Sequence, residues 1–217
     1  MKTAIYDILM SGRNLDEAFS DARFFALCIS HRAMARKGNI SVALGLEIRQ
    51  LSHLFSRYFP RIAASRSTAQ CTKVYLHSAA GGTFLCQCLG KKNKASARNE
   101  ETGDLVKLLL DQRASVNQAT EWVAAILATG CLGDDHLWQD LGLTNREDLS
   151  DVIKRHFPGL YFKNTGNMKW KKFFYKQLCD QAEVRLCQAP SCNVCNDYAQ
   201  CFGPEDASGW NLLAAQG

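Results

Sequence analysis

Apolar residues recur every three or four positions through much of this chain. Over residues 15–36 they include Ala22, Phe25 and Ile29, with Asp16 in the first turn. An α-helix turns once in about 3.6 residues, so this spacing places the apolar side chains on one face. The pattern therefore predicts an amphipathic helix over residues 15–36. The same kind of spacing predicts further helices over residues 104–113, 119–128 and 167–180.

Two stretches of the chain have similar sequences. Residues 44–60 read LGLEIRQLSHLFSRYFP and residues 141–158 read LGLTNREDLSDVIKRHFP, with one extra residue in the second. Each carries an apolar stripe and ends at a proline, so each predicts a helix. In the second copy Thr144 and Glu147 have the spacing of a capping box at the helix start. We interpret the likeness as an internal duplication, with chance similarity of two short amphipathic helices as the alternative.

The alternation of helical pattern and irregular sequence divides the chain into four regions. Residues 1–60 form an N-terminal helical region and residues 104–180 a second one. Between them, residues 61–103 are rich in Ser, Ala, Gly and Lys with little periodicity, which is typical of a linker or long loop. Residues 181–217 form a cysteine-rich tail. We expect a mainly α protein, with a helical domain followed by an irregular C-terminal loop.

The predicted linker contains Cys71, Cys86 and Cys88. A Cys-x-Cys pair can ligate a metal, but surface thiols in a loop are the more ordinary explanation. The sequence alone therefore favours surface thiols here.

Composition and charge narrow the class of protein. The chain has 217 residues and a formal charge of +5. Its N-terminus reaches Asp7 before any long apolar run, unlike a secretory signal, and no apolar stretch approaches the roughly 20 residues that cross a bilayer. The modest positive charge comes without helix-turn-helix or zinc-finger spacing. We expect a cytoplasmic protein that binds neither membranes nor nucleic acid.

Catalytic signatures are weak. The sequence has no glycine-rich phosphate loop and no convincing pairing of a nucleophile with a base. Asp134, Asp135 and His136 form a polar trio that loop solvation explains adequately. We therefore expect a protein that is not an enzyme.

The strongest chemical signal is a group of four cysteines near the C-terminus, in the order Cys-x4-Cys-x2-Cys-x5-Cys. It consists of Cys187, Cys192, Cys195 and Cys201, and we refer to it as the cysteine tetrad. A reducing cytosol disfavours disulfides, so metal ligation is the leading explanation for such density. Ordering fifteen residues costs on the order of 15–30 kcal/mol of backbone entropy, and metal bonds would offset that cost. Closely spaced thiolates suit an iron–sulfur cluster, whereas zinc usually takes two separated Cys-x2-Cys pairs. The tetrad thus predicts a metal-binding C-terminal loop.

A basic, aromatic helix precedes the tetrad. In residues 167–180 the aromatic side chains fall on one face, while Lys169, Lys172 and Lys176 line another. A solvated lysine face is the ordinary explanation. These lysines could also lower the electrostatic cost of an anionic cluster or of another bound anion, or bind an acidic partner protein.

The sequence resembles the NifQ family of nitrogen-fixation molybdenum proteins. The tetrad spacing is that family's signature, and it continues from Cys201 through Phe-Gly-Pro to Glu205. The phrases HLWQDLGL, HFP and MKWKKFFY also resemble the family; they begin at His136, His156 and Met168. The likeness covers residues 104–205 well and residues 15–60 loosely, and residues 61–103 depart from it.

The resemblance implies a cytoplasmic metallochaperone with an iron–sulfur cluster of the 3Fe–4S or 4Fe–4S type on the tetrad. It further implies that the protein takes molybdenum from molybdate or a molybdenum–sulfur species, holds it within a molybdenum–iron–sulfur cluster and donates it for iron–molybdenum cofactor biosynthesis. The implied acceptors are the nitrogenase iron protein and the cofactor scaffold complex. His136 and Cys131 are candidate additional metal ligands, although a lone histidine near a helix start is more often a capping or packing residue.

Two other functions fit the tetrad. An iron–sulfur electron carrier would use the same ligands without molybdenum. A zinc-stabilised interaction module would contain neither iron nor molybdenum and would be colourless.

Overall fold

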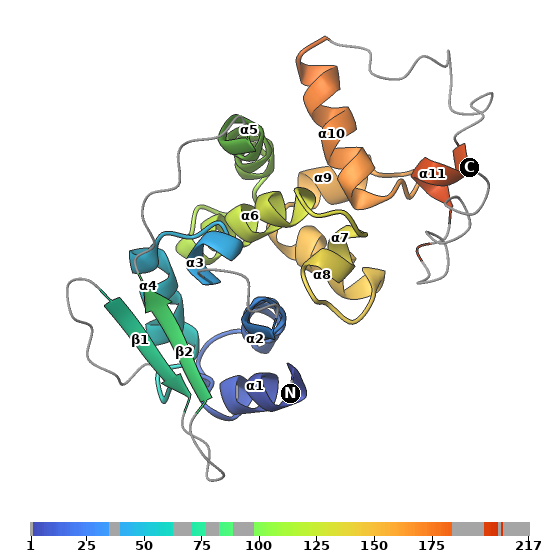
Figure 1. The fold of residues 1–217 in the computed structure, drawn as a ribbon. Helices are drawn as coiled ribbons and strands as arrows, with labels where there is room; N and C mark the ends of the chain where they lie inside the picture. The colour runs from blue at the N-terminus through green and yellow to red at the C-terminus, as the bar shows by residue number, and fades with distance from the viewer. Residues whose placement is uncertain are drawn as a thin grey trace, which may run out of the picture.

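Helices dominate the described part of the chain, as predicted (Figure 1). The computed structural model describes residues 2–34, 40–62, 71–76, 83–88, 98–183, 198–203 and 205. The elements are α1 (Lys2–Ser11), α2 (Phe19–Met34), α3 (Ile40–Ala43), α4 (Ile48–Tyr58), β1 (Cys71–Leu76), β2 (Thr83–Cys88), α5 (Arg98–Asp111), α6 (Gln118–Cys131), α7 (Leu137–Asp140), α8 (Arg146–His156), α9 (Pro158–Lys163), α10 (Trp170–Gln181) and α11 (Tyr198–Phe202).

Helix α6 lies at the centre of the fold. Most of its residues are buried, including Trp122. Phe25 of α2 and Tyr58 of α4 lie against each other with ring centroids 4.8 Å apart, and both rings also contact Trp122. One hydrophobic core runs from α1 to α10. The two predicted helical regions, 1–60 and 104–180, are therefore packed around a shared interior.

The predicted helices are confirmed, with shifted starts. α2 begins at Phe19 rather than at residue 15, because Asn14 Oδ1 accepts a hydrogen bond from the Asp16 backbone N–H at 3.1 Å and turns the chain there. α8 begins after Asn145, whose side chain accepts from the Asp148 N–H at 2.8 Å. The capping box predicted from Thr144 and Glu147 was therefore one residue out of register.

The two similar stretches, residues 44–60 and 141–158, adopt the same local structure. We call α3–α4 the first unit and α7–α8 the second unit. In each, a four-residue helix is followed two residues later by a glycine with positive φ, +68° at Gly45 and +74° at Gly142. Each unit then continues into an 11-residue helix. Those helices end alike, at Phe59 (φ −133°, ψ 53°) and at Phe157 (φ −134°, ψ 58°). Shared backbone geometry at both ends supports the interpretation as an internal duplication.

β1 and β2 form an antiparallel hairpin that the sequence did not predict. β1 and β2 pair with Cys71 opposite Cys88 and Leu76 opposite Thr83. The hairpin and the first turns of α5 lie within residues 61–103, which we had predicted to be a linker or long loop. Six-residue strands are short enough for their alternation to be hidden by the Ser-, Gly- and Lys-rich sequence around them.

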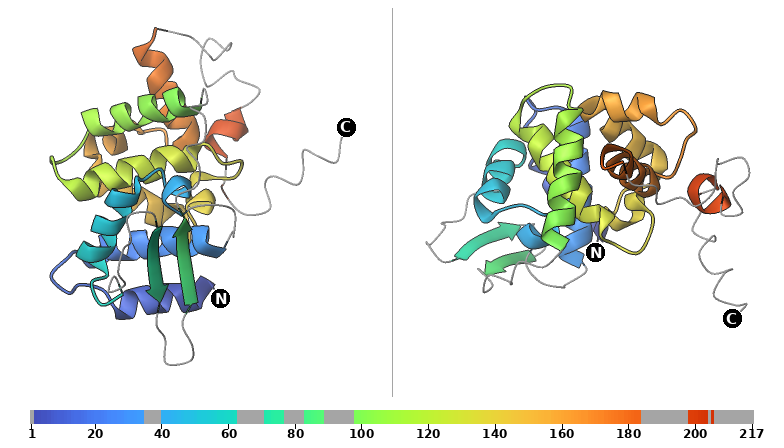
Figure 2. Two further views of the ribbon diagram at one scale, coloured as in Figure 1. Left: turned by 60° about the vertical axis from the view of Figure 1, so that its left-hand side comes forward. Right: turned by 90° about the horizontal axis from the view of Figure 1, so that it is seen from above.

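The hairpin and α11 lie at opposite ends of the molecule, as Figure 1 and the right-hand view of Figure 2 show. No helix in the described ranges is both long enough and apolar enough to cross a membrane.

Candidate metal centre at the C-terminal segment

Cys201 is the member of the cysteine tetrad that the structure describes. It lies half-buried in α11. Cys187, Cys192 and Cys195 fall outside the described residues. Within α11 the rings of Tyr198 and Phe202 stack at a centroid distance of 4.6 Å. The position of α11 therefore fixes where the C-terminal end of the tetrad meets the helical body.

Lys169, at the start of α10, donates two hydrogen bonds to α11. The Lys169 backbone N–H donates to the Cys201 carbonyl oxygen at 2.8 Å. The Lys169 Nζ donates to the Ala199 carbonyl oxygen at 3.2 Å. Lys169 is the residue that precedes the first turn of α10. One of the three lysines predicted to bind an anion or a partner is thus in contact with the segment that carries Cys201.

A buried ion pair secures the chain just beyond α11. Arg146 Nη1 lies 2.5 Å from Glu205 Oε1, and their side chains are only 16% and 6% exposed. The other guanidinium nitrogen donates to Asn167 Oδ1 at 2.9 Å and to the Met168 carbonyl at 2.9 Å. Arg146 therefore joins three segments, namely the start of α8, the turn before α10 and the end of the C-terminal segment. Charge-assisted bonds of this kind are the stronger class of protein hydrogen bond.

His136, a predicted additional metal ligand, lies in the same neighbourhood. It is buried at the start of α7, where its backbone N–H donates to Gln139 Oε1 at 3.1 Å. Burial lowers the pKa of His136, and the charges of Lys169 and Lys171 lower it further, while Glu205 opposes the shift. The imidazole is therefore neutral near pH 7, which is the form that binds metals. Whether it ligates a metal stays a prediction.

Cys131, the other predicted additional ligand, lies inside the core near the end of α6. Burial raises the pKa of its thiol to about 12. A thiol must lose its proton to bind a metal well, and this environment disfavours that loss. Lys171, close enough to lower that pKa slightly, is itself paired with Asp140 and donates to the Gly133 carbonyl at 2.9 Å. The surroundings of Cys131 are those of a packing residue.

The remaining lysines of the predicted basic face differ from Lys169. Lys172 and Lys176 are exposed, and Lys176 pairs with Asp180 one turn later at 2.5 Å. On the opposite side of the helix, Trp170 and Phe174 are buried, as predicted. Lys172 and Lys176 thus face solvent, whereas Lys169, which precedes α10, contacts α11.

A buried polar network was not anticipated from the sequence. His156 contacts Thr120 Oγ1 through Nδ1 at 3.0 Å and Asp21 Oδ1 through Nε2 at 3.1 Å. Arg155 also pairs with Asp21. A hydroxyl, an imidazole and a carboxylate in a row resemble a catalytic arrangement, but Thr120 is almost completely buried. The network joins α2, α6 and α8 inside the fold, where no substrate reaches, so we interpret it as structural.

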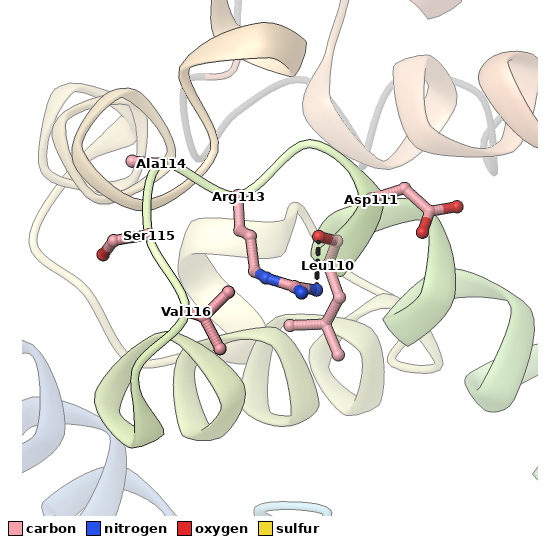
Figure 3. Close-up of a pocket in the computed structure, with 6 residues that line it drawn as sticks. All are labelled: Leu110, Asp111, Arg113, Ala114, Ser115 and Val116. Atoms are coloured by element: carbon pink, nitrogen blue, oxygen red, sulfur yellow. Dashed lines mark hydrogen bonds between the residues drawn. The ribbon is translucent and has the colours of Figure 1, made fainter.

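Two hollows in the described surface lie away from α11. One, of about 370 Å³, is formed by the loop between α5 and α6 and includes Arg113 and Val116 (Figure 3). Arg113 donates there to the Leu110 carbonyl at 2.9 Å. The other, of about 680 Å³, lies between α2 and α8. Neither is lined by a cysteine or a histidine. Across the described residues, no three His, Cys, Asp or Glu side chains gather as a metal site.

Comparison with known proteins adds independent information. The NifQ family model matches residues 24–203. Protein NifQ of Azotobacter vinelandii is 39% identical over 163 residues, which cover 75% of this chain and 78% of that protein. Protein NifQ of Rhodobacter capsulatus is 46% identical over 101 residues, or 46% of this chain and 56% of the relative. The Protein NifQ homolog of Sinorhizobium fredii is 35% identical over 158 residues, or 69% of each chain. No solved structure matches the fold.

Proposed function

Because this chain belongs to the NifQ family, we propose that it serves nitrogen fixation as a molybdenum carrier. In this proposal an iron–sulfur cluster on the cysteine tetrad holds molybdenum and gives it up for iron–molybdenum cofactor synthesis. The protein is then an accessory donor and not an enzyme. The observation that carries the proposal is the anchoring of the tetrad's last cysteine between Lys169 and the Arg146–Glu205 pair.

The residues around α11 fit a thiolate-bound cluster. Four thiolates are the usual donor set of such clusters. Lys169 provides positive charge next to the anchored segment, which lowers the cost of holding an anionic group there. A bound iron–sulfur cluster with an open corner would supply the position at which molybdenum can be taken up and released.

His136 would serve the proposal as a neutral nitrogen ligand or as a hydrogen-bonding neighbour. Its imidazole is held by the start of α7 and lies near enough to Glu205 for the two to interact electrostatically. Glu205 is paired with Arg146, so a residue just beyond α11 is held near His136. A ligand on the rigid helical body, together with ligands on the tail, would let the protein loosen one side of a centre without losing the other.

The acceptors that we propose are the nitrogenase iron protein and the cofactor scaffold complex. Lys172 and Lys176 are exposed on α10, beside the segment that docks Cys201. Exposed cations near a delivery site would favour an acidic partner surface and speed its approach. The same cations would attract molybdate, which is an anion.

Metal analysis tests the proposal. Protein prepared without oxygen and supplied with molybdate should contain iron, sulfide and molybdenum, and should show a paramagnetic signal of the cluster in at least one oxidation state. Cys192→Ser and Cys195→Ser should lose most of the iron and molybdenum. Cys179→Ser is the matched control, because Cys179 is half-buried on α10 and outside the tetrad; it should retain both metals.

Two results would replace the proposal with another function. Iron and sulfide without molybdenum, even after exposure to molybdate, would identify an electron carrier. A colourless protein with one zinc ion lost in the tetrad variants would identify a zinc-stabilised interaction module. Transfer of molybdenum from the loaded protein to the cofactor scaffold complex, measured by the maturation of cofactor, would test the donor step itself.

A further inference from the structure

The turn between α9 and α10, residues 164–168, meets α11, and we call it the docking turn (Figure 1). A Cβ added at Gly166 would lie 3.3 Å from Cε1 of the Phe202 ring, so this ring lies close to the turn backbone. Directly after the turn, the Lys169 backbone N–H donates to the Cys201 carbonyl at 2.8 Å. The conformation of the docking turn therefore decides where α11 is held.

Asn164 fixes the two ends of the docking turn to each other. Its Oδ1 accepts a hydrogen bond from the Met168 backbone N–H at 2.8 Å, and its Nδ2 donates to the Met168 carbonyl at 2.8 Å. A side-chain amide can bind both groups because it carries an acceptor and donors. The Asn167 N–H also donates to the Asn164 carbonyl at 3.1 Å, although Asn167 has a φ of 53°, in the left-handed region. These bonds lie within the turn, so its shape does not depend on α11.

One peptide unit connects Asn164 to the segment that carries Cys201. The Met168 carbonyl and the Lys169 N–H belong to the same planar peptide, so the direction of one sets the direction of the other. The carbonyl accepts from Asn164 Nδ2 at 2.8 Å and from Arg146 Nη2 at 2.9 Å. The N–H on the other side of that peptide donates to Cys201. Holding the carbonyl therefore aims the N–H at α11.

We propose that Asn164 is a positioning residue of the metal centre, which acts through the Met168–Lys169 peptide to hold Cys201 against the helical body. The inference rests on the function proposed above. Asn164 supplies no ligand in it, so its loss leaves all four sulfur donors in the chain. What changes is the attachment of the last donor, and metal should then be retained less firmly.

Iron release tests this role in the full chain. Parent and variants are loaded anaerobically with iron and sulfide, and the transfer of iron to a chelator is followed by absorbance. Asn164→Ala should release iron about 10-fold faster, the lower end of what the loss of an outer-shell support costs in metal affinity. Asn164→Asp, which keeps the acceptor and loses the donor, should also release iron faster than the parent. Asn117→Ala is the matched control, because Asn117 caps α6 by accepting from the Thr120 N–H at 2.9 Å; it should release iron at the parent rate.

Hydrogen exchange supplies a second measurement that needs no metal. In the metal-free chain, residues 198–203 should exchange faster in Asn164→Ala than in the parent, and at the parent rate in Asn117→Ala. A residue that supported only the general stability of the fold would not act selectively on this segment.

Three results would overturn the role of Asn164. One is iron release at the parent rate in both Asn164 variants, another is equal acceleration in Asn117→Ala, and the third is unchanged exchange at residues 198–203 in Asn164→Ala. In each case a parent protein that holds iron and molybdenum would leave the proposed function in place. A parent protein that takes up no iron would overturn the proposed function, and with it any role of Asn164 toward a metal centre.

Discussion

The first unit (α3–α4) and the second unit (α7–α8) share a backbone but differ in what their side chains do. The last inward-facing position of the longer helix is Tyr58 in the first unit and His156 in the second. Tyr58 packs into the aromatic core beside Phe25, whereas His156 holds Asp21 and Thr120. At the start of the longer helix, Ile48 corresponds to Arg146, which binds Glu205.

This difference shows how one scaffold came to serve two roles. In the first unit the repeated backbone completes the apolar core. In the second unit the same backbone presents polar groups, which join helices internally and anchor the C-terminal segment. The glycine and the inward apolar positions are the common requirement, and the residues at the two ends of the longer helix decide the role.

Breaking the shared turn should have the largest effect. A Cβ added at Gly142 would lie 2.3 Å from the His31 Cβ, and one added at Gly45 would lie 2.0 Å from Thr129 Oγ1. Both glycines also have positive φ, so Gly142→Ala and Gly45→Ala should each lower the free energy of unfolding by about 4 kcal/mol, summing strain and overpacking. Chemical denaturation measures this.

Gly103→Ala is the control for that comparison. Gly103 lies in α5 with no atom within 4 Å of an added Cβ. Alanine is the better helix former, so this substitution should raise the free energy of unfolding by up to about 1 kcal/mol. Equal effects at all three glycines would contradict the requirement for a special turn in each unit.

The next largest effect is expected from Asp21→Asn. This substitution removes the carboxylate that pairs with His156 and Arg155 of the second unit. Burial pushes the pKa of Asp21 upward, but the hydrogen bond and charge of His156, together with Arg155, outweigh it, so the pKa lies below the usual 3.8. The charged carboxylate therefore contributes stability above about pH 3.8, and this contribution is lost as the pH falls through the lower folded-state pKa. Asp21→Asn should cost about 3 kcal/mol at pH 7 and should reduce the loss of stability on acidification.

Denaturation curves between pH 7 and pH 2.5 measure that difference. Asp180→Asn is the matched control, since its partner Lys176 is exposed and such pairs contribute little. The pKa of Asp148 is also lowered, with burial opposing it and Arg23 prevailing, so part of the acid dependence should remain in Asp21→Asn. If the free energy of unfolding of Asp21→Asn depended on pH as it does in the parent protein, Asp21 would not contribute to the acid dependence.

Loosening the anchor of α11 should have the smallest effect on global stability but a clear local one. Arg146→Met and Glu205→Gln, alone and combined, should reveal a coupling energy of about 1–2 kcal/mol. Hydrogen exchange should accelerate at residues 198–203 in Arg146→Met. Arg23→Met, which removes a pair with Asp148 instead, should leave exchange in α11 unchanged. Similar exchange in both variants would show that Arg146 does not hold the segment.

The helical spacing of apolar residues was enough to predict most of the helices. The helices α2, α4, α6, α8 and α10 could be predicted because each buries one regular face against the core. The hairpin could not be predicted from composition, although Thr72, Val74 and Leu76 alternate with residues of the other face. Each strand is only six residues long and lies within polar sequence, so the alternation does not appear in the composition of the region.

The four cysteines of the candidate site were chosen from the sequence, and their metal binding stays a prediction; the contacts that hold α11 in place could not be predicted. Cys201 and its three companions are evident from spacing alone. Arg146 and Glu205 are 59 residues apart, and nothing in either sequence neighbourhood connects them. Thr120, His156 and Asp21 are likewise brought together only by the packing of three helices. Long-range polar pairs depend on the tertiary arrangement, which a single sequence does not disclose.

The hydrogen bond from the Lys169 backbone N–H, just before α10, is accepted by the main-chain carbonyl of Cys201. Exchanging sulfur for oxygen at residue 201 would therefore leave that attachment in place and alter only the donor atom. A Cys201→Ser protein that still holds its C-terminal helix would separate loss of chemistry from loss of architecture, a distinction that substitutions elsewhere in the tail do not offer.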